Sequence, residues 1–248
     1  MKRCTAFKKK EKKPVCSAVI VAAGSSQRMG SDKLLMKLGA MPVLCRTILA
    51  FENCPLVDEV IIVTRQEKLE QIAKLCHDNG MHKVKQVVSG GATRMESALA
   101  GVSATRHDAE LIAIHDGARP LVSQEVIERA IYAGQKYRSA APAVPSVDTL
   151  KMVDAEGFVC QTVDRACTRR VQTPQVFDAD LIKGALTDAV NKALTLTDDC
   201  SAMERMGIRT FLVEGDPDNL KITTPNDLVA AEAIVKAKGD WYANRSWV

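Results

Sequence analysis

The stretch AAGSSQRMGSDK, residues 22–33, follows the short apolar run 17–21 and combines small residues with two cations. It matches neither common glycine-rich signature, because G-x-G-x-x-G is absent and no Lys-Ser/Thr pair follows Gly30. Backbone N–H groups of such a turn can nevertheless hold phosphate oxygens. Arg28 could bind a phosphate through its planar guanidinium, and Lys33 could act as a compact point charge. A tight turn without a ligand is the alternative.

A carboxylate and a further cation follow another apolar run, in HDGARP at residues 115–120. Asp116 could hold a hard cation such as Mg²⁺ beside a triphosphate, because Mg²⁺ prefers oxygen ligands. Arg119 is one more candidate for anion binding. The alternative is a turn in which the Asp116 side chain caps its own backbone.

Three more segments carry polar residues whose roles stay open when each is taken alone. TVDR ends in Arg165 and NLKIT contains Lys221, and both cations are typical of an exposed surface. TDDC begins at Thr197, and its polar residues can simply cap the helix that follows. Asp-Pro-Asp at 216–218 resembles a glycosyltransferase metal pair but is also a common turn.

Length and charge limit the classes to which the chain can belong. With 248 residues, 46% of them hydrophobic, it can bury the core of one large α/β domain. The net charge of +4 comes from residues 1–13, which carry seven Lys/Arg and one acid. The other 235 residues carry 27 basic and 29 acidic side chains, so the body lacks the charge of a nucleic-acid-binding domain. We expect residues 1–14 to form a basic, disordered extension.

No feature indicates a membrane protein or a secreted protein. No apolar stretch approaches the roughly 20 residues that a membrane span needs, and the N-terminus lacks the apolar segment of a secretory signal. The eight cysteines include no C-x-x-C pair, so neither a zinc ribbon nor a thioredoxin-like site is indicated. We therefore predict a cytoplasmic protein with reduced cysteines and no membrane partner.

Strands and helices alternate along the first part of the chain. Apolar runs predict the strands and 3.6-residue periodicity predicts the helices. The strands are 17–24, 57–65, 84–91 and 110–120, and the helices are 41–53, 67–80, 94–104 and 124–137. Thr93 and Glu96 form a capping box for the third helix. This order is typical of a doubly wound, mainly parallel α/β sheet, in which Gly24, Gly90 and Asp116 would be neighbours at the carboxyl ends of strands.

Residues 140–165 break this rhythm and show no helical period. They predict two or three β segments, with DAEG at 154–157 forming a hairpin turn. Because an inserted ribbon cannot bury both of its faces alone, a second subunit is the simplest partner for it. Helical periodicity returns at 178–194, and a strand at 208–215 precedes the last helix, 226–238.

Taken together and in order, the motifs resemble the 2-C-methyl-D-erythritol 4-phosphate cytidylyltransferase family over about residues 15–238. The matching motifs are AAGSSQRMGSDK, GGATRMESA, HDGARP, TVDR, TPQ, TDDCSAMERMG and NLKIT followed by P-x-D-L. The resemblance implies a Rossmann-like nucleotidyltransferase fold in one domain, 15–240, with residues 143–165 as an inserted β-arm that pairs two subunits into a homodimer. It also implies transfer of CMP from CTP to methylerythritol phosphate with Mg²⁺, giving 4-diphosphocytidyl-2-C-methyl-D-erythritol and pyrophosphate in non-mevalonate isoprenoid synthesis.

The resemblance further implies a role for each matching residue. The residues near the CTP triphosphate, cytosine, ribose and metal are Ala22, Ala23, Gly24, Ser25, Arg28, Lys33, Gly91, Ser97 and Asp116. Asp116 is the candidate metal ligand among them. The residues near methylerythritol phosphate are Arg119, Thr149, Arg165, Thr173, Thr197 and Lys221. Thr149 and Arg165 would reach that phosphate from the arm of the other subunit.

The first loop departs from the family pattern. Members usually have Pro-Lys-Gln after a longer loop, whereas this chain has Asp32-Lys33-Leu34. Lys33 is therefore the residue whose position most needs a structure. Cys200 also stands where alanine is common, with no obvious catalytic consequence.

The implied reaction needs charge rather than a general base. The second pKa of a phosphate monoester is near 6, so the attacking oxygen is already largely ionised at neutral pH. The difficulty is to bring two anions together and to stabilise the transferring group, which positioning and electrostatics achieve. We expect Arg28 and Lys33 to stabilise the α-phosphate of CTP, and Arg165 and Lys221 to neutralise the incoming phosphate. These four are the predicted catalytic residues.

Two other functions remain open. A ribitol 5-phosphate cytidylyltransferase, or another sugar-phosphate nucleotidyltransferase, would use the same loop and differ in its acceptor pocket. A non-catalytic regulatory protein that binds nucleotides could have kept the fold, although it need not keep all four cations. A dehydrogenase is disfavoured, because G-x-G-x-x-G is missing.

Overall fold

The computed structural model describes residues 13–24 and 32–239 of the chain. Most of the predicted basic extension and the loop residues Ser25 and Arg28 lie outside this part. The expectations for them therefore stay predictions.

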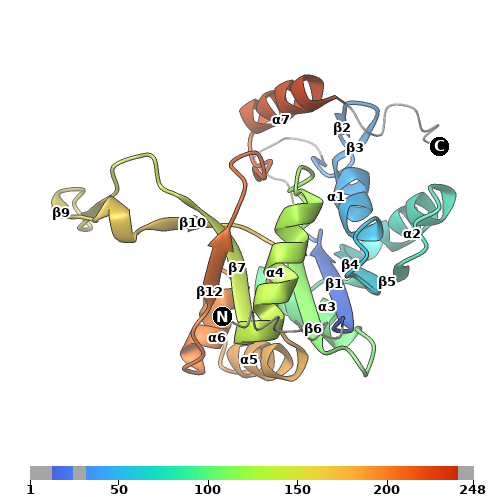
Figure 1. Ribbon diagram of the computed structural model, residues 1–248, viewed down its shortest axis with the longest axis horizontal. Coiled ribbons are helices and arrows are strands. Elements are labelled where there is room, and N and C mark those ends of the chain that lie inside the picture. The colour runs from blue at the N-terminus through green and yellow to red at the C-terminus, as the bar shows by residue number, and fades with distance from the viewer. Residues whose placement is uncertain (1–12, 25–31, 240–248) are drawn as a thin grey trace, which may run out of the picture.

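Parallel strands form one half of the main sheet (Figure 1). They are β1 (Cys16–Val21), β4 (Glu59–Thr64), β5 (Val84–Ser89) and β6 (Leu111–Asp116). β1 pairs in parallel with β4 on one side and with β6 on the other, which is the predicted doubly wound arrangement. Both faces of β1 are apolar, as a buried parallel strand requires: Ala18 and Ile20 pack into one hydrophobic cluster and Val19 into the other.

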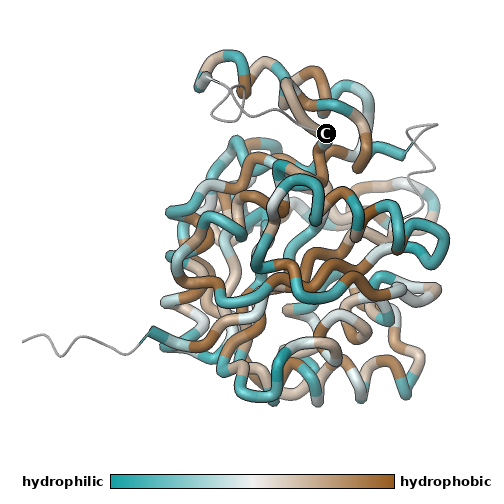
Figure 2. The backbone as a smooth tube through the Cα atoms, turned by 90° about the vertical axis from the view of Figure 1, so that its right-hand side faces the viewer, coloured by the Kyte–Doolittle hydropathy of each residue, from teal (hydrophilic) through white to brown (hydrophobic). Residues whose placement is uncertain are grey.

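Helices cover both faces of this sheet (Figure 1). One hydrophobic cluster contains side chains of α1 (Val43–Glu52), α2 (Leu69–Asp78), α4 (Gln124–Tyr137) and α7 (Pro225–Lys238). The other contains side chains of α3 (Arg94–Ser103), α5 (Ala179–Asn191) and α6 (Asp199–Arg205). A short 3₁₀ turn, η2 (Gln66–Lys68), precedes α2. Figure 2 shows the hydrophobic segments mainly in the middle of the molecule, between these helical layers.

Local sequence signals set where the helices begin. Thr93 accepts a hydrogen bond from the Glu96 backbone N–H, and the Glu96 side chain accepts one from the Thr93 N–H. The predicted capping box is therefore confirmed at the start of α3. α1 begins at Val43 rather than at 41, because the two preceding residues form β3 (Met41–Pro42), which pairs with β2 (Lys37–Leu38).

In the other half of the sheet, the sequence predicts the strand at 208–215 but not the strands at 169–171 and 175–178. The strands of this half are β7 (Ser139–Pro145), β10 (Arg169–Val171), β11 (Gln175–Asp178) and β12 (Phe211–Glu214). β11 runs antiparallel to β6 and β7, β10 runs antiparallel to β7, and β12 runs parallel to β7. The predicted ribbon at 140–165 therefore begins inside the main sheet, because the small apolar residues of β7 are buried there. Residues 143–145, the start of the predicted β-arm, likewise pair within this sheet.

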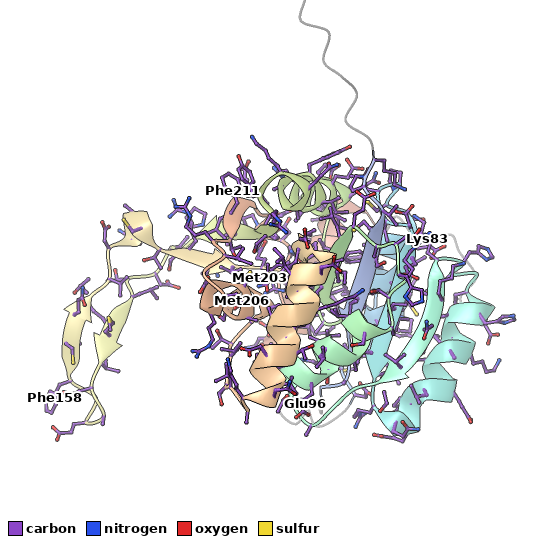
Figure 3. All side chains as sticks on the ribbon, turned by 90° about the horizontal axis from the view of Figure 1, so that it is seen from below. Lys83, Glu96, Phe158, Met203, Met206 and Phe211 are labelled. Atoms are coloured by element: carbon purple, nitrogen blue, oxygen red, sulfur yellow. The ribbon has the colours of Figure 1, made fainter. Side chains whose placement is uncertain are left out.

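A two-stranded hairpin projects from this half of the sheet (Figure 1). Its strands, β8 (Lys151–Val153) and β9 (Val159–Thr162), are antiparallel, and the side chain of Asp154 accepts backbone hydrogen bonds in the turn between them. The predicted hairpin turn is thereby confirmed. Figure 3 places Phe158 at the far tip of the hairpin. The 3₁₀ turn η3 (Arg165–Cys167) then leads the chain back to β10.

Of the helices in the described part, none is long and apolar enough to cross a membrane. The seven cysteines found there are all free, and only Cys160 and Cys167 are exposed. Burial raises the pKa of Cys45 and Cys76 to about 12, so these thiols are inert core side chains.

Candidate active site

A pocket of about 610 Å³ opens at the carboxyl edge of β1 and β6. β4 and β5 lie on one side of β1, and β6 lies on the other, so the strand order reverses here. Ligands usually bind at such a point in doubly wound folds. The predicted residues that line the pocket are Ala22, Ala23, Gly24, Lys33, Gly91, Ser97, Asp116 and Lys221. Segments far apart in the sequence therefore meet at one site.

Asp116 is a buried carboxylate in the pocket wall, and three cations surround it. Lys221 Nζ lies 2.9 Å from Oδ2, Arg119 Nε lies 3.5 Å from the same oxygen, and Arg94 Nη2 lies 3.5 Å from Oδ1. Burial by itself raises the pKa of Asp116, but the three cations together hold that pKa well below its usual range. Asp116 is therefore a permanent anion that keeps cations in place at the pocket.

Arg94 also lines the pocket, although it is not among the residues predicted from the sequence. An ion pair with Asp199 holds it there. Its guanidinium donates two parallel hydrogen bonds to the Asp199 carboxylate, with Nη1–Oδ1 at 2.9 Å and Nη2–Oδ2 at 2.8 Å. Burial raises the pKa of Asp199, and the charge of Arg94 partly offsets that rise. One signal in the sequence could have pointed to Arg94. A cation in the first turn of a helix interacts unfavourably with the helix dipole, so its presence there suggests an acidic partner elsewhere. Here the ion pair with α6 compensates for that position.

The turn after β5 forms a closely packed wall of the pocket. Ser97 on α3 donates to the Thr93 carbonyl at 2.9 Å and accepts from the Gly91 N–H at 3.2 Å. A Cβ atom at Gly90 would lie 2.6 Å from the Ala23 Cβ and 2.7 Å from the Ser97 Oγ, so only glycine lets the two loops approach. Gly90 and the loop after β1 are thus neighbours, as the sequence predicts.

Lys33 lies in the pocket despite the unusual sequence before it. Its Nζ donates to the Ile222 carbonyl at 2.8 Å, next to Lys221 in the chain. Asp32 forms an ion pair of 3.0 Å with Arg65, which follows β4. This contact ties the end of the β1 loop to the neighbouring strand and brings Lys33 to the pocket.

Comparison with known proteins decides the family. The family model described as 2-C-methyl-D-erythritol 4-phosphate cytidylyltransferase matches residues 16–237. The chain belongs to this family.

Relatives and solved structures agree with that assignment. The 2-C-methyl-D-erythritol 4-phosphate cytidylyltransferase of Caldanaerobacter subterraneus subsp. tengcongensis is 43% identical over 89% of this chain and 98% of the relative. That of Halalkalibacterium halodurans is 41% identical over 90% of this chain and 97% of the relative. The crystal structure of 4-diphosphocytidyl-2C-methyl-D-erythritol synthase from Anaerococcus prevotii matches with a TM-score of 0.82 at 30% identity, covering 90% of this chain and 97% of that one. The family resemblance and the Rossmann-like nucleotidyltransferase fold are therefore confirmed.

In this member of the cytidylyltransferase family, Arg119 and Thr173 lie directly beside Asp116. Thr173 Oγ1 accepts from the Asp116 backbone N–H at 3.1 Å. Arg119 Nη1 donates to the Asn219 carbonyl at 2.7 Å, while its buried Nε has no hydrogen-bond partner among the described residues. Two predicted acceptor-binding residues thus adjoin the carboxylate that lines the pocket.

Arg119 and Thr173 do not themselves line the pocket, and three further predicted residues of this cytidylyltransferase do not line it either. Thr149 and Arg165 are exposed near the hairpin, and Arg165 Nη1 donates to the Val147 carbonyl at 3.1 Å. Thr197 is exposed before α6, with its hydroxyl 3.5 Å from Ser201 Oγ. Their roles in holding an acceptor stay predictions.

Two acidic segments of the chain have structural roles. Asp216 accepts from the Asp218 N–H at 2.8 Å, and Asp218 forms an ion pair of 2.6 Å with Lys238 of α7, so Asp-Pro-Asp forms a turn here. Asp198 is the N-cap of α6, where it accepts from the Ser201 N–H. The capping alternative for TDDC is therefore correct for this residue.

Asp116 remains the candidate metal ligand of this cytidylyltransferase. The residues that the structure describes contain no group of three or more His, Cys, Asp or Glu side chains able to hold a metal ion. Mg²⁺ is commonly held by one or two carboxylates together with substrate phosphates. A single carboxylate in the wall of the pocket fits that pattern, provided that a triphosphate supplies the other ligands.

Proposed function

We propose that this protein transfers CMP from CTP to 2-C-methyl-D-erythritol 4-phosphate, with release of pyrophosphate. Membership of the cytidylyltransferase family supports this reaction. The observation that carries the proposal is the meeting of three cations, Lys33, Arg94 and Lys221, in one pocket at the carboxyl edge of the sheet. A site that brings two phosphate-bearing substrates together needs such a concentration of positive charge.

The reaction joins an acceptor phosphate to the α-phosphate of CTP. An oxygen of the acceptor attacks the α-phosphorus, a new P–O bond forms, and the bond to the β-phosphate breaks, so that pyrophosphate leaves. Because the monoester is largely ionised at neutral pH, no side chain has to remove a proton. The protein therefore acts by positioning two anions and offsetting their charge.

Each charged residue would act on a different phosphate. Lys33, together with Arg28, would stabilise the charge on the α-phosphate during transfer. Lys221 would neutralise the acceptor phosphate, and its ion pair of 2.9 Å with Asp116 supports this by holding the ammonium group in place.

Other residues in the pocket and beside it would bind the remaining parts of the substrates. The small residues after β1 would receive the triphosphate, and Gly91 and Ser97 would lie near the cytosine and ribose. Arg119 would hold the acceptor phosphate beside Asp116, with Thr173 behind it and Thr197 at the floor of the acceptor site.

Mg²⁺ is the proposed cofactor, and Asp116 would provide one of its ligands. When bound, the cation supplies positive charge that offsets the charge of the triphosphate and of the leaving pyrophosphate. Asp116 suits this role because neighbouring cations keep its carboxyl group ionised.

We further propose a single domain over residues 15–240 that dimerises through its hairpin arm (Figure 1). Met152, Val153 and Phe158 on the hairpin are exposed by 55%, 58% and 69%, and an isolated two-stranded hairpin cannot bury such residues itself. A second subunit would cover them. The same contact would bring Thr149 and Arg165 to the other subunit's acceptor site.

A cytoplasmic location is also part of the proposal. All seven cysteines among the described residues are free thiols, which is usual in a reducing compartment.

The experiment is to measure pyrophosphate release by the purified protein with CTP, Mg²⁺ and one acceptor at a time. We expect release with methylerythritol phosphate, none with ribitol 5-phosphate, and none after Mg²⁺ is chelated. Release with ribitol 5-phosphate alone would assign the chain to the sister reaction. No release with any sugar phosphate would favour a nucleotide-binding protein without this activity.

A further inference from the structure

Four residues beside the pocket form a closed ring of hydrogen bonds. His115 Nε2 lies 3.2 Å from the Arg119 carbonyl, and His115 Nδ1 lies 2.9 Å from Thr173 Oγ1. The Asn219 side-chain amide donates to the Thr173 carbonyl at 2.9 Å. Arg119 Nη1 donates to the Asn219 carbonyl at 2.7 Å and closes the ring.

The direction of each hydrogen bond follows from the groups that make it. A carbonyl only accepts, so His115 Nε2 carries the proton that is donated to Arg119. In the neutral imidazole the other ring nitrogen is then an acceptor, and Thr173 donates its hydroxyl proton to Nδ1. Thr173 Oγ1 in turn accepts from the Asp116 backbone N–H at 3.1 Å. One tautomer of His115 therefore satisfies every contact.

The ring is buried and joins three separate segments of the chain. His115 and Asn219 are fully buried, and Thr173 is 4% exposed. His115 lies at the end of β6, Thr173 precedes β11, and Asn219 lies after β12, two residues before Lys221. Because buried polar groups without partners are costly, these hydrogen bonds fix how the three segments lie relative to one another.

We propose that His115 and Asn219 are positioning residues for the acceptor phosphate, acting through Arg119, with Thr173 as the link between them. The inference rests on the proposed function, which assigns Arg119 to the acceptor. His115 holds the Thr173 hydroxyl and the Arg119 backbone carbonyl. Asn219 holds the Thr173 carbonyl with its side-chain amide and the Arg119 guanidinium with its backbone carbonyl. Arg119 is thus held at two points, and breaking the ring at either His115 or the Asn219 amide would displace it.

The nucleotide side of the pocket has separate supports. Ser97 and Gly91 are held by hydrogen bonds within the turn after β5 and the start of α3, and none of these involves the ring. Breaking the ring should therefore raise the KM for methylerythritol phosphate much more than the KM for CTP, to which the ring is linked through the hydrogen bond between Thr173 and the Asp116 N–H. Because a misplacement of about 1 Å can cost of the order of a hundredfold, we expect the acceptor KM to rise about tenfold or more.

Two single variants and their combination test the ring. His115→Phe removes both ring hydrogen bonds of His115, and Asn219→Leu removes the one from its side-chain amide to the Thr173 carbonyl. Both keep side-chain bulk, and each should raise the acceptor KM. The double variant should be little worse than either one, because a closed ring is already lost when its first link is broken. Additive effects in the double variant would contradict a single coupled unit.

Phe51→Leu is the matched control. The Phe51 ring packs on His115 with the ring centroids 4.8 Å apart and takes no part in the ring of hydrogen bonds. Thermal unfolding should occur at a lower temperature in all three single variants, whereas only His115→Phe and Asn219→Leu should raise the acceptor KM. If His115→Phe does not fold, His115→Gln should restore folding through an amide that can donate to Arg119, and its acceptor KM should still exceed that of wild type.

An acceptor KM within about twofold of wild type in both ring variants would overturn the positioning role, and so would equal rises in the KM of both substrates. A wild-type protein that releases no pyrophosphate with methylerythritol phosphate would overturn the proposed function and, with it, the acceptor assignment. The wild-type measurement thus separates failure of the proposed function from failure of the ring alone.

Discussion

At the residue scale, Asp116 and Lys221 form a preorganised pair. The carboxylate holds the ammonium group 2.9 Å away before any phosphate arrives. A cation that is already in place needs little reorganisation when negative charge develops, and such groups contribute strongly to phosphoryl transfer. Lys221 keeps 39% of its side chain exposed and so stays accessible to a ligand.

Replacing Lys221 with alanine should remove this contribution. We expect kcat/KM with methylerythritol phosphate to fall by about a hundredfold to a thousandfold, as for the loss of one donor to a developing oxyanion. Lys192→Ala is the control, since Lys192 is an exposed lysine of the C-cap of α5 whose ion pair with Asp188 should contribute little. Steady-state kinetics measures both variants. Turnover of Lys221→Ala within a few-fold of wild type would remove Lys221 from the mechanism.

His115 should make the protein less stable as the pH falls. Burial lowers the pKa of its imidazole to about 4, from the ordinary value of 6.5 expected in the unfolded chain. Between these two values the unfolded chain binds a proton that the folded protein does not bind, so the free energy of unfolding decreases with decreasing pH. Across this pH range the free energy of unfolding should fall by about 3 kcal/mol in total.

Urea unfolding of wild type and His115→Phe at neutral and mildly acidic pH measures this effect. The variant cannot titrate at this position, so it should lose less unfolding free energy than wild type on acidification. Equal losses in the two proteins would contradict a buried neutral histidine.

At the element scale, the two halves of the sheet differ in how far the sequence predicts them. The strands from β1 to β6 alternate with amphipathic helices, and both signals are local. β7 consists of small apolar residues without alternation, and it pairs with β11 and β12, which come much later in the chain. Such pairing depends on tertiary contacts, so the pattern of residues 139–145 alone could not place this strand in the main sheet.

The candidate site likewise has one part that the sequence predicts and one part that it does not. The motif at the end of one strand predicts Asp116 and Arg119, because the carboxyl ends of parallel strands meet at one edge. The role of Lys221 is implied by the family resemblance alone. The pair between Arg94 and Asp199 joins residues 105 positions apart, and neither local motif specifies the other. Contacts of this kind become visible only when the helices have been packed on the sheet.

The ion pair between Asp32 and Arg65 should matter for CTP and not for the acceptor. It ties the end of the β1 loop to the end of β4, and a partly exposed pair contributes up to about 1 kcal/mol. Arg65→Met and Asp32→Asn should therefore each raise the KM for CTP by up to about fivefold. The double variant should be no worse than either single one, and additive losses would show that the two residues act separately.

At the scale of the whole molecule, the central question is whether one chain suffices for activity. The body carries the pocket, whereas the hairpin extends away from it and has Phe158 at its tip (Figure 3). Arg165 lies near the base of the hairpin and does not line the pocket of its own chain. In a dimer, the arm of each subunit would bring Arg165 to the pocket of the other subunit.

Hybrid dimers test this arrangement. Arg165→Ala and Lys221→Ala subunits, each of which we expect to be nearly inactive alone, are co-expressed with different tags, and the hybrid is purified through both. One pocket of the hybrid would have Lys221 and receive Arg165 from the other chain, so we expect about half of the wild-type activity per dimer. If Arg165 served the pocket of its own chain, both pockets would lack a residue and the hybrid would stay inactive.

The central claim is that the acceptor phosphate attacks the α-phosphorus of CTP. CTP labelled with radioactive phosphorus at either the α or the γ position, incubated with Mg²⁺ and methylerythritol phosphate, tests it most directly. The account predicts that the α label appears in 4-diphosphocytidyl-2-C-methyl-D-erythritol and the γ label in pyrophosphate. Transfer of the γ label to the acceptor, or no labelled acceptor from α-labelled CTP, would contradict it.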